Sequence, residues 1–280
     1  MAGKVGRATA GRPPPPGTHS VPGRVPLGTL GGERPAAAQL AELIRESEST
    51  VALTGAGVSV PSGIPDFRTP GKGLWERVDP MSVATIDAFH RDTKRFWDFY
   101  RPRFHMLTDK QPNPAHEALA ELERRGLLEA VITQNIDRLH RQAGSERVIE
   151  VHGSIATASC TSCAANYRLE QVESLFDTDG VATCACCAGK VKPDVVLFGE
   201  LLPQSAIAEA ERLCAGADLL LCVGSSLEVY PVAGLPELTV DGGGRLAIVT
   251  RSSTPYDSAA TVRLDGDVAE DLTAVLAALE

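Results

Sequence analysis

The sequence predicts an α/β protein, with a Rossmann-like parallel sheet domain and a smaller zinc-ribbon and helical module. Short apolar runs recur along the chain and are separated by helical or loop segments, which is the pattern of a buried parallel sheet. Two pairs of closely spaced cysteines interrupt this pattern. The hydrophobic content of 43% over 280 residues is enough for a substantial core.

Residues 1–36 differ in composition from the remainder of the chain. They contain four consecutive prolines, many glycines and five basic residues against one acid, so they carry +4 of a net charge of −9 and the remainder carries −13. Such a segment buries too little apolar surface to offset the entropy that it loses on ordering. We therefore expect a disordered basic tail over 1–36 and a folded domain over 37–280.

The acidic body also limits the classes of partner. Nucleic-acid-binding proteins normally present a basic face, so the charge argues against nucleic acid. No run approaches the roughly 18 consecutive apolar residues of a membrane span. No charged start followed by an apolar block suggests secretion. We expect a cytoplasmic protein without a membrane partner.

A helix and a series of strands follow the tail. Apolar residues recur at helical spacing from Ala37 to Ile44, and the short apolar segment 51–53 is then predicted to be a buried strand. Later apolar runs predict further strands at 129–133, 148–151, 219–223 and 246–250. The region 70–110 mixes aromatic and charged residues, which fits helices beside a cleft.

The segment after the first strand combines a turn of small residues with an acid, an aromatic residue and a base. The turn consists of Gly55, Ala56 and Gly57. It allows the backbone to approach a ligand closely and exposes main-chain amides that can bind phosphate. Val60 occupies the place of the third glycine of a dinucleotide fingerprint, which argues against a plain Rossmann dehydrogenase. The alternative is a tight turn that only packs strand against helix.

The end of that segment favours a ligand site over a structural turn. Three side chains there can engage an amide, cover a sugar and pair with phosphate; they belong to Asp66, Phe67 and Arg68.

Four cysteines have the spacing of a zinc ribbon. Each pair has two intervening residues, and 20 residues separate the pairs, which are Cys160 with Cys163 and Cys184 with Cys187. Four thiolates close a tetrahedral zinc sphere and leave no position for water, so such a zinc ion is structural. Cys186 is an alternative ligand, although it does not reproduce the two-residue gap. We expect residues 154–196 to form an inserted zinc-ribbon module.

Polar residues follow three of the predicted strands. Gln134, Asn135 and Asp137 come after the run 129–133, where they can contact a ligand or can cap the next helix. Gly224, Ser225 and Ser226 close another strand. His152 directly follows the run 148–151, so it projects from a strand end, where α/β proteins place their chemistry. The other histidines have simpler explanations, such as polar helix surfaces or a helix start.

With these motifs assembled, the chain resembles the sirtuin family of NAD-dependent protein-lysine deacylases from about residue 37 to the C-terminus. The motifs occur in the family's order; they are GAGVSVPSGIPDFR, TQNIDRLH, the VHG histidine, the paired cysteines, KPDVVLFGE and VGSSLEVYP.

The resemblance implies NAD and one structural zinc ion as cofactors. It places the NAD site at Gly55, Ala56, Gly57, Val60, Asp66, Phe67, Arg68, Gln134, Asn135, Ile136, Asp137, Gly224, Ser225, Ser226, Thr250 and Val268. In this arrangement Asp137 and Ile136 hold nicotinamide, and the last four residues lie toward the adenosine. Thr250 stands where family members often have asparagine.

The resemblance also implies a mechanism and a substrate. The acyl-lysine oxygen attacks the ribose carbon as nicotinamide leaves, with His152 as general base toward a ribose hydroxyl. Asn135 positions the ribose or a water, and Phe67 shields the reactive carbon. An acyl-lysine protein or peptide is then expected to bind by strand addition between the segments 192–200 and 227–229.

The acyl group is a separate question. Tyr100 and Arg103 form a Tyr-x-x-Arg pair similar to the element with which some family members bind succinyl or malonyl carboxylates, whereas the loop from Phe67 to Leu74 is closer to deacetylases. Pro102 would distort the helix that aligns the pair, and the alternative is an amphipathic helix with a solvated arginine. We expect deacetylation first and acidic-acyl removal second. Mono-ADP-ribosyl transfer and a non-enzymatic zinc-ribbon binding module are further alternatives.

Overall fold

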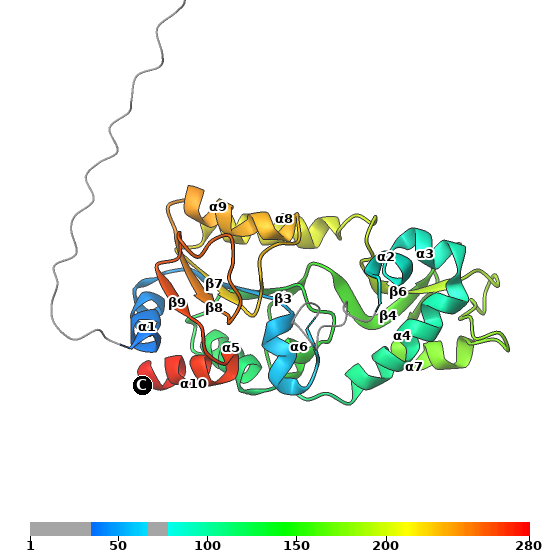
Figure 1. Ribbon diagram of the computed structural model, residues 1–280, viewed down its shortest axis with the longest axis horizontal. Helices are drawn as coiled ribbons and strands as arrows, with labels where there is room; N and C mark the ends of the chain where they lie inside the picture. The colour runs from blue at the N-terminus through cyan, green and yellow to red at the C-terminus, as the bar shows by residue number, and fades with distance from the viewer. Residues whose placement is uncertain (1–34, 67–77) are drawn as a thin grey trace, which may run out of the picture. The chain divides into compact units, whose positions relative to one another are not determined.

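The computed structural model describes residues 35–66 and 78–280. A six-stranded parallel sheet forms the larger part of this fold (Figure 1). Its order is β3-β2-β1-β7-β8-β9. The strands are β1 (Thr50–Thr54), β2 (Ala130–Thr133), β3 (Val148–Glu150), β7 (Leu219–Val223), β8 (Arg245–Val249) and β9 (Val262–Leu264). The predicted α/β class is confirmed, and each predicted strand differs from the observed one by at most one residue at either end.

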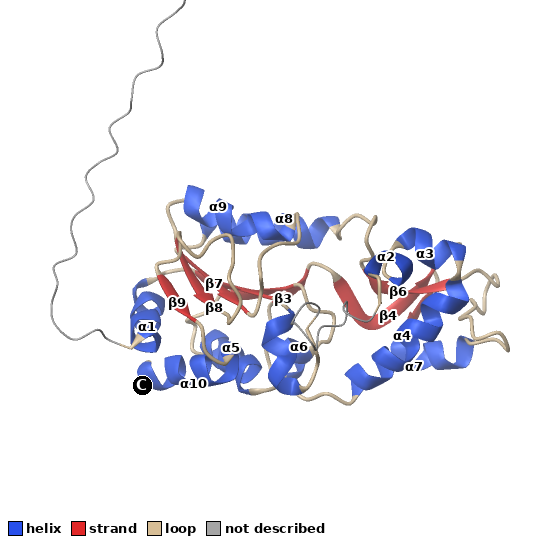
Figure 2. Cartoon of the chain, viewed as in Figure 1, coloured by secondary structure: helices blue, strands red, loops and turns tan. Residues whose placement is uncertain are grey.

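Helices cover both faces of this sheet (Figure 2). Successive strand residues point to opposite faces, so Ala52 and Val131 pack under one set of helices and Val51 and Ile132 under the other. Burial on both faces explains why the strands are continuous apolar runs. The first set is α1 (Ala36–Glu46), α5 (Pro114–Arg124) and α10 (Val268–Ala278), and the second is α8 (Gln204–Gly216) and α9 (Leu235–Asp241).

The strand order reverses beside β1. The strands β2 and β3 extend the sheet on one side of β1, whereas β7, β8 and β9 lie on the other side. Open α/β sheets bind their ligands at such a switch point, outside the carboxyl ends of the strands. The polar segments that follow β1, β2 and β7 therefore meet at one edge of the sheet.

A second sheet of three antiparallel strands continues directly from β3. Buried aromatic side chains, among them Phe89, Phe96 and Trp97, pack two helices against it. The strands are β4 (Gly153–Cys160), β5 (Asn166–Arg168) and β6 (Val191–Val195). The helices are α3 (Ile86–Arg91) and α4 (Thr93–Thr108), and the short α2 (Pro80–Val83) precedes them. The aromatic residues of this region therefore form a core beside the zinc-ribbon segment.

The remaining elements are short. They are α6 (Leu139–Gln142), α7 (Leu169–Val172) and the 3-10 turns η1 (Ala56–Ser62), η3 (Glu173–Leu175) and η4 (Val232–Gly234). Over residues 35–66 and 78–280, no helix combines the length and the apolar character that crossing a bilayer requires.

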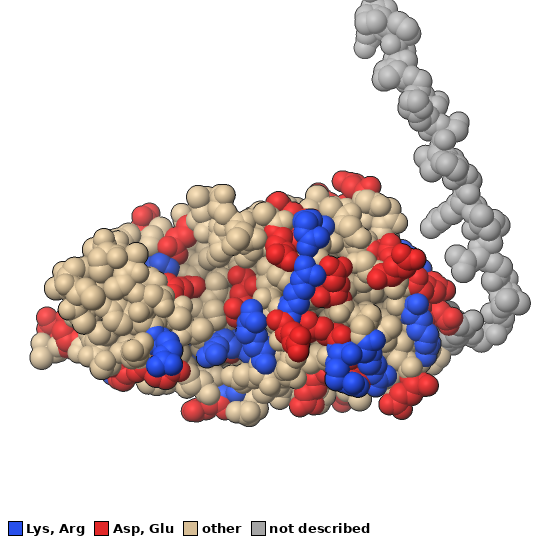
Figure 3. All heavy atoms as spheres, turned by 180° about the vertical axis from the view of Figure 1, so that it is seen from behind, with Lys and Arg blue, Asp and Glu red and all other residues tan. Residues whose placement is uncertain are grey.

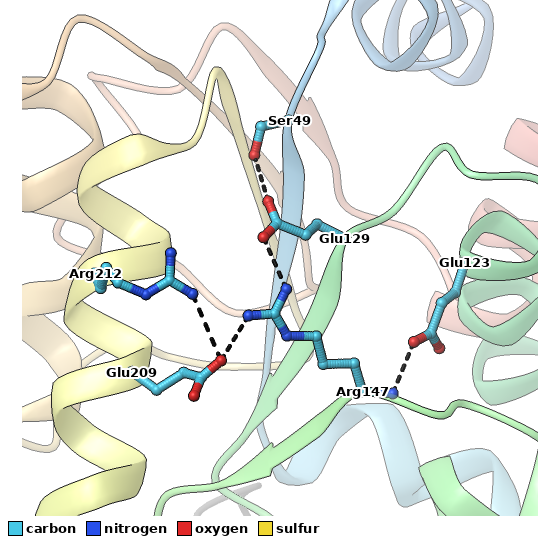
Figure 4. Close-up of polar contacts among 6 residues, drawn as sticks. All are labelled: Ser49, Glu123, Glu129, Arg147, Glu209 and Arg212. Carbon is cyan, nitrogen blue, oxygen red and sulfur yellow. Dashed lines mark hydrogen bonds and ion pairs between the residues drawn. The ribbon is translucent and has the colours of Figure 1, made fainter.

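Ion pairs link neighbouring segments at the edge of the large sheet where the strands begin, opposite the edge with the polar segments (Figure 4). Arg147, just before β3, donates to Glu129 at 2.8 Å and to Glu209 of α8 at 2.6 Å. Its main-chain nitrogen donates to Glu123 at 2.8 Å. Basic and acidic side chains also lie next to each other on the face shown in Figure 3. These contacts are solvent-exposed and tie neighbouring segments together far from the predicted site.

Candidate functional site

His152 lies where the chain passes from β3 to β4. Its Nδ1 is 3.0 Å from the main-chain oxygen of Gln134. A carbonyl can only accept a hydrogen bond, so Nδ1 carries the proton and Nε2 holds the lone pair of a neutral imidazole. Burial lowers the pKa of His152, although the hydrogen bond to Gln134 opposes this. His152 can therefore act as a base at neutral pH.

Asn135 and Asp137, which follow β2, meet at the hydroxyl of Ser59. The Asn135 Nδ2 donates to Ser59 Oγ at 3.0 Å and to the main-chain oxygen of Gly55 at 3.2 Å. Ser59 Oγ in turn donates to Asp137 Oδ2 at 2.7 Å. The Asn135 amide is thus fixed by its nitrogen, which leaves its Oδ1 as the atom available to a ligand.

Asp137 is a buried carboxyl, with 6% of its surface exposed. Burial raises its pKa, while hydrogen bonds from the Leu139 amide and the Ser59 hydroxyl lower it. The Leu139 amide, at 2.9 Å from Oδ1, is the helix-cap contact that the sequence left as an alternative. Asp137 therefore accepts the first amide of α6, from the position before the N-cap residue Arg138, and also faces the buried polar cluster.

Two buried histidines lie behind this cluster, and the sequence analysis did not identify them as site residues. His116 Nε2 is 3.4 Å from Ser59 Oγ, and His140 Nε2 is 2.9 Å from Thr54 Oγ1. The two rings meet edge to face at a centroid distance of 4.8 Å. Burial lowers the pKa of His116 to about 4 and that of His140 to about 3, so both are neutral at physiological pH. The expectation that histidines other than His152 lie on polar helix surfaces or at a helix start does not hold for the buried His140, and its place in the TQNIDRLH motif was a signal to the contrary.

The glycine turn after β1 packs against the turn after β7. The Gly57 amide donates to the Gly224 oxygen at 2.8 Å. A Cβ on Gly57 would come within 2.7 Å of Gly224, and one on Gly224 would come within 2.2 Å of the Val58 nitrogen. Gln134 then joins the two turns to β2, because its Nε2 donates to Ser225 Oγ at 2.9 Å. Glycine is therefore required at positions 57 and 224, because the two turns are in contact there. This contact lies at the switch point of the sheet.

The other predicted cofactor residues are distributed along the same edge. Thr250 directly follows β8 and is buried, Val268 begins α10, and Val60 is 42% exposed in η1. The main-chain oxygen of Ile136 accepts from the Ile155 amide at 3.1 Å, which links the segment after β2 to β4. Asp66 is the last residue before a gap in the described chain, and Phe67 and Arg68 lie outside the described residues.

Tyr100 and Arg103 are both held within α4. The Tyr100 ring stacks on Phe104 at a centroid distance of 5.5 Å, and burial raises the pKa of its hydroxyl to about 12. The Arg103 guanidinium lies 3.5 Å from the Phe99 ring centroid and donates to the Phe99 oxygen. The helix continues through Pro102. In this arrangement the Arg103 guanidinium contacts its own helix at Phe99.

The four predicted metal ligands form a compact cluster. The sulfurs of Cys160, Cys163, Cys184 and Cys187 all lie within 4.8 Å of one another. The distances from Cys160 to Cys187 and from Cys163 to Cys184 are 3.5 and 3.6 Å. Zinc–sulfur bonds of about 2.3 Å in a tetrahedron place sulfurs about 3.8 Å apart, so the cluster fits a zinc ion. Cys186 is exposed and outside the cluster, which resolves the ambiguity about this residue.

Neighbouring groups favour the thiolate form of two of these cysteines, Cys160 and Cys184. The Tyr167 hydroxyl is 3.1 Å from Cys184 Sγ, and its hydrogen bond is the main reason why the pKa of Cys184 falls to about 6. The main-chain amides of Ser162 and Cys186 lie 3.4 Å from the sulfurs of Cys160 and Cys184. Hydrogen bonds to sulfur favour the ionised form that binds a metal. Tyr167 had no sequence signal, because its position depends on the pairing of β5 with β4.

Comparison with known proteins agrees with this geometry. The Sir2 family profile matches residues 55–231. An NAD-dependent protein deacetylase of Thermotoga maritima is 45% identical over 229 residues, which cover 82% of this chain and 92% of the relative. An NAD-dependent protein deacylase of Thermococcus sibiricus is 41% identical over 237 residues, which cover 84% of this chain and 92% of the relative.

Solved structures match over the same extent. A structure of Sir2 with a p53 peptide and NAD+ has a TM-score of 0.80 and 44% identity, and the match covers 85% of this chain and 96% of that one. A structure of Sir2 bound to an acetylated peptide has a TM-score of 0.80 and 41% identity, with coverage of 86% and 98%. The fold and site define an α/β protein with a dinucleotide-type switch point and a four-cysteine zinc module. The chain belongs to the Sir2 family.

Proposed function

We propose that this chain is an NAD-dependent protein-lysine deacetylase, which transfers the acyl group of a lysine side chain to ADP-ribose and releases nicotinamide. The observation that carries the proposal is the meeting of His152, Asn135 and Asp137 at the switch point of a parallel sheet. Membership of the Sir2 family and the NAD-dependent activity named for its relatives support it. We assign the catalytic domain to 37–280, its zinc-ribbon module to 154–196 and a basic tail to 1–36.

The residues at this edge fit an extended dinucleotide. The turns after β1 and β7 face the middle of the site and suit the pyrophosphate, since ligands of such sheets lie across the switch point. We assign nicotinamide to Asp137 and Ile136, which lie on the side of β2 and β3. The adenosine then lies toward β7 and β8, at Ser225, Ser226, Thr250 and Val268. The cofactor set is completed by Gly55, Ala56, Gly57, Val60, Asp66, Phe67, Arg68, Gln134, Asn135 and Gly224.

When bound, NAD supplies a ribose carbon that the acyl oxygen can attack as nicotinamide departs. His152 accepts a proton from a ribose hydroxyl at Nε2, because Nδ1 is already occupied by Gln134. Asn135 presents Oδ1 to the ribose or to a water, with its nitrogen held by Ser59. The zinc ion has no open position within four thiolates, so its role is structural.

The peptide site is assigned to the segments 192–200 and 227–229, in which or directly beside which exposed apolar side chains lie. Phe198, Leu201 and Tyr230 are 46%, 84% and 71% exposed. Phe198 is also joined to the segment before α3, because its amide donates to Ala84 at 2.9 Å and its oxygen accepts from Ile86 at 3.0 Å. An extended acyl-lysine peptide can lie between these segments by strand addition. We propose no nucleic-acid or membrane partner, and the cytoplasmic location stays a prediction.

We base the acyl preference on the positions of the Tyr100 and Arg103 side chains in α4. Arg103 is turned toward Phe99 and Tyr100 is buried in an aromatic stack, so we propose acetyl-lysine as the main substrate. The test is incubation with NAD and matched acetyl-, succinyl- and malonyl-lysine peptides, followed by nicotinamide release and peptide mass. Acetyl removal as the fastest reaction supports the proposal. Faster removal of the acidic groups, lost in Arg103→Ala, would contradict the acetyl preference, and no removal from any peptide would contradict the activity.

A further inference from the structure

His140 is a fully buried histidine to which the proposed reaction gives no role. Only 2% of its surface is exposed. Its Nε2 lies 2.9 Å from Thr54 Oγ1, and its Nδ1 has no hydrogen-bond partner among the described residues. An unpaired buried N–H is rarer in proteins than an unpaired acceptor, so we place the proton on Nε2, which then donates to Thr54.

The hydrogen bond from His140 continues to the main chain of Asn135. Thr54 Oγ1 donates to Thr133 Oγ1 at 2.8 Å. Thr133 Oγ1 also accepts from the Asn135 main-chain amide at 3.1 Å. Both acceptor positions of Thr133 are thus filled, one by Thr54 and one by Asn135. The whole path lies in buried residues, where a hydrogen bond is electrostatically stronger than in water.

A second path holds the side chain of the same asparagine. The Asn113 amide lies 3.3 Å from His116 Nδ1, so the proton of His116 is on Nε2, which faces Ser59 Oγ. Ser59 accepts the Asn135 side-chain amide at 3.0 Å. One histidine therefore leads to the backbone of Asn135 and the other to its side chain.

We propose that His140 is a positioning residue of the deacetylase reaction, which fixes the main chain of Asn135 through Thr54 and Thr133. This inference rests on the proposed function, in which Asn135 contacts the ribose or a water. Burial keeps His140 neutral, and a neutral ring has a single N–H donor, which here is Nε2. Misplacement of a group by about 1 Å can reduce a rate on the order of 100-fold, so a link that ends on Asn135 is expected to affect turnover.

The first test compares His140→Phe with His140→Gln. Phenylalanine keeps the ring beside His116 but removes the donor, whereas glutamine can still donate from a similar position. We expect kcat for nicotinamide release to fall on the order of 10-fold or more in His140→Phe, with the KM for peptide little changed and partial recovery in His140→Gln. Unchanged kcat in His140→Phe with an active wild type would overturn the inference and leave the proposed function intact.

The second test is a double-mutant cycle. Thr133→Val removes the last link of the same path, with Thr133→Ser as its matched control, and Ser59→Ala acts on the other path. The effects of His140→Phe and Thr133→Val on kcat should be less than additive, and the coupling within this pair should exceed the coupling between His140→Phe and Ser59→Ala. Additive effects within the first pair would contradict a common path.

A third measurement does not depend on activity. Hydrogen exchange of the Asn135 amide, followed by NMR, reports on its bond to Thr133. We expect exchange at Asn135 to be at least about 10-fold faster in His140→Phe, with little change at the Ala52 amide in the centre of β1. Equal protection of Asn135 in both proteins would show that His140 does not hold this amide, whether or not the wild type is an enzyme.

Discussion

The Nδ1 atom of His152 donates a hydrogen bond to the main-chain oxygen of Gln134 across 3.0 Å. This contact determines the tautomer, because the remaining nitrogen must carry the lone pair. It also connects the predicted base to the segment that contains Asn135 and Asp137. The orientation of the base and the position of its neighbours therefore depend on the same stretch of chain after β2.

This relationship predicts the pH dependence of the reaction. Burial lowers the pKa of His152, so the imidazole stays unprotonated to a lower pH than a solvated histidine does. Activity should be complete above about pH 6.5, the ordinary histidine value, and should be lost only as the pH falls through the lowered value. The check is the profile of kcat/KM between pH 4.5 and 8. An acid limb centred above about pH 7 would contradict the assignment.

The zinc cluster predicts opposite outcomes for two neighbouring cysteines. Cys163→Ser removes one of the four clustered sulfurs, whereas Cys186→Ser changes an exposed thiol outside the cluster. We expect the first variant to lose its zinc and to unfold at a lower temperature, because metal binding free energy contributes to folding. The second should keep one zinc ion per chain. Mass spectrometry measures the zinc content of both variants. Loss of zinc in Cys186→Ser would contradict the assignment of Cys160, Cys163, Cys184 and Cys187 as the four ligands.

The contact between the turns after β1 and β7 predicts that only glycine is tolerated at position 224 without a loss of stability. The φ of Gly224, 61°, lies in the left-handed region, and a Cβ would come within 2.2 Å of the Val58 nitrogen. Gly224→Ala should therefore reduce the free energy of unfolding by more than about 2 kcal/mol, through backbone strain and a clash.

Gly126→Ala is the matched control for this variant. Gly126 has a similar φ of 71°, but a Cβ there would meet nothing within 4 Å. The free energy of unfolding of Gly126→Ala should be lower than that of the wild type by about 1 kcal/mol, from backbone strain alone. Urea unfolding of both proteins measures the difference, and equal losses would show that the contact with Val58 is relaxed without cost.

The buried histidines predict that acid destabilises the fold. The pKa values of His116 and His140 are lowered to about 4 and 3 by burial. Above about pH 6.5 both residues are neutral whether the chain is folded or not, so they have no effect on stability. Below that pH the unfolded chain takes up protons that the folded chain excludes. Each residue should then lower the free energy of unfolding by about 2 kcal/mol at pH 5.

Urea unfolding between pH 7.5 and 5 tests this dependence. Asp137 acts in the opposite direction, because its raised pKa favours the folded state on acidification. A variant therefore isolates the histidine contribution: His140→Phe should show a smaller loss between pH 7 and pH 5 than the wild type. Identical pH dependence in the two proteins would mean that His140 is protonated in the folded state.

The sequence predicted five strands of the large sheet, namely β1, β2, β3, β7 and β8, because each of them contains a continuous apolar run. It did not predict β9, where only three residues pair and the middle one is Arg263. The cysteine spacing identified the zinc ligands, since that information is local. The hydrogen bonds among site residues could not be foreseen, because Ser59 and Asp137 are 78 positions apart and meet only when β1 and β2 are paired. His140 was missed for the same reason.

Transfer of an acetyl group from lysine to ADP-ribose is the activity that we propose for this chain. The most direct measurement is mass spectrometry of all products after incubation with NAD and an acetyl-lysine peptide, with His152→Ala as the control. We expect equal amounts of free lysine peptide, nicotinamide and acetyl-ADP-ribose from the wild type, and none of these products from the variant, whose zinc content should be intact. Nicotinamide release with the peptide still acetylated, or acetate in place of acetyl-ADP-ribose as the initial product, would contradict the proposed activity.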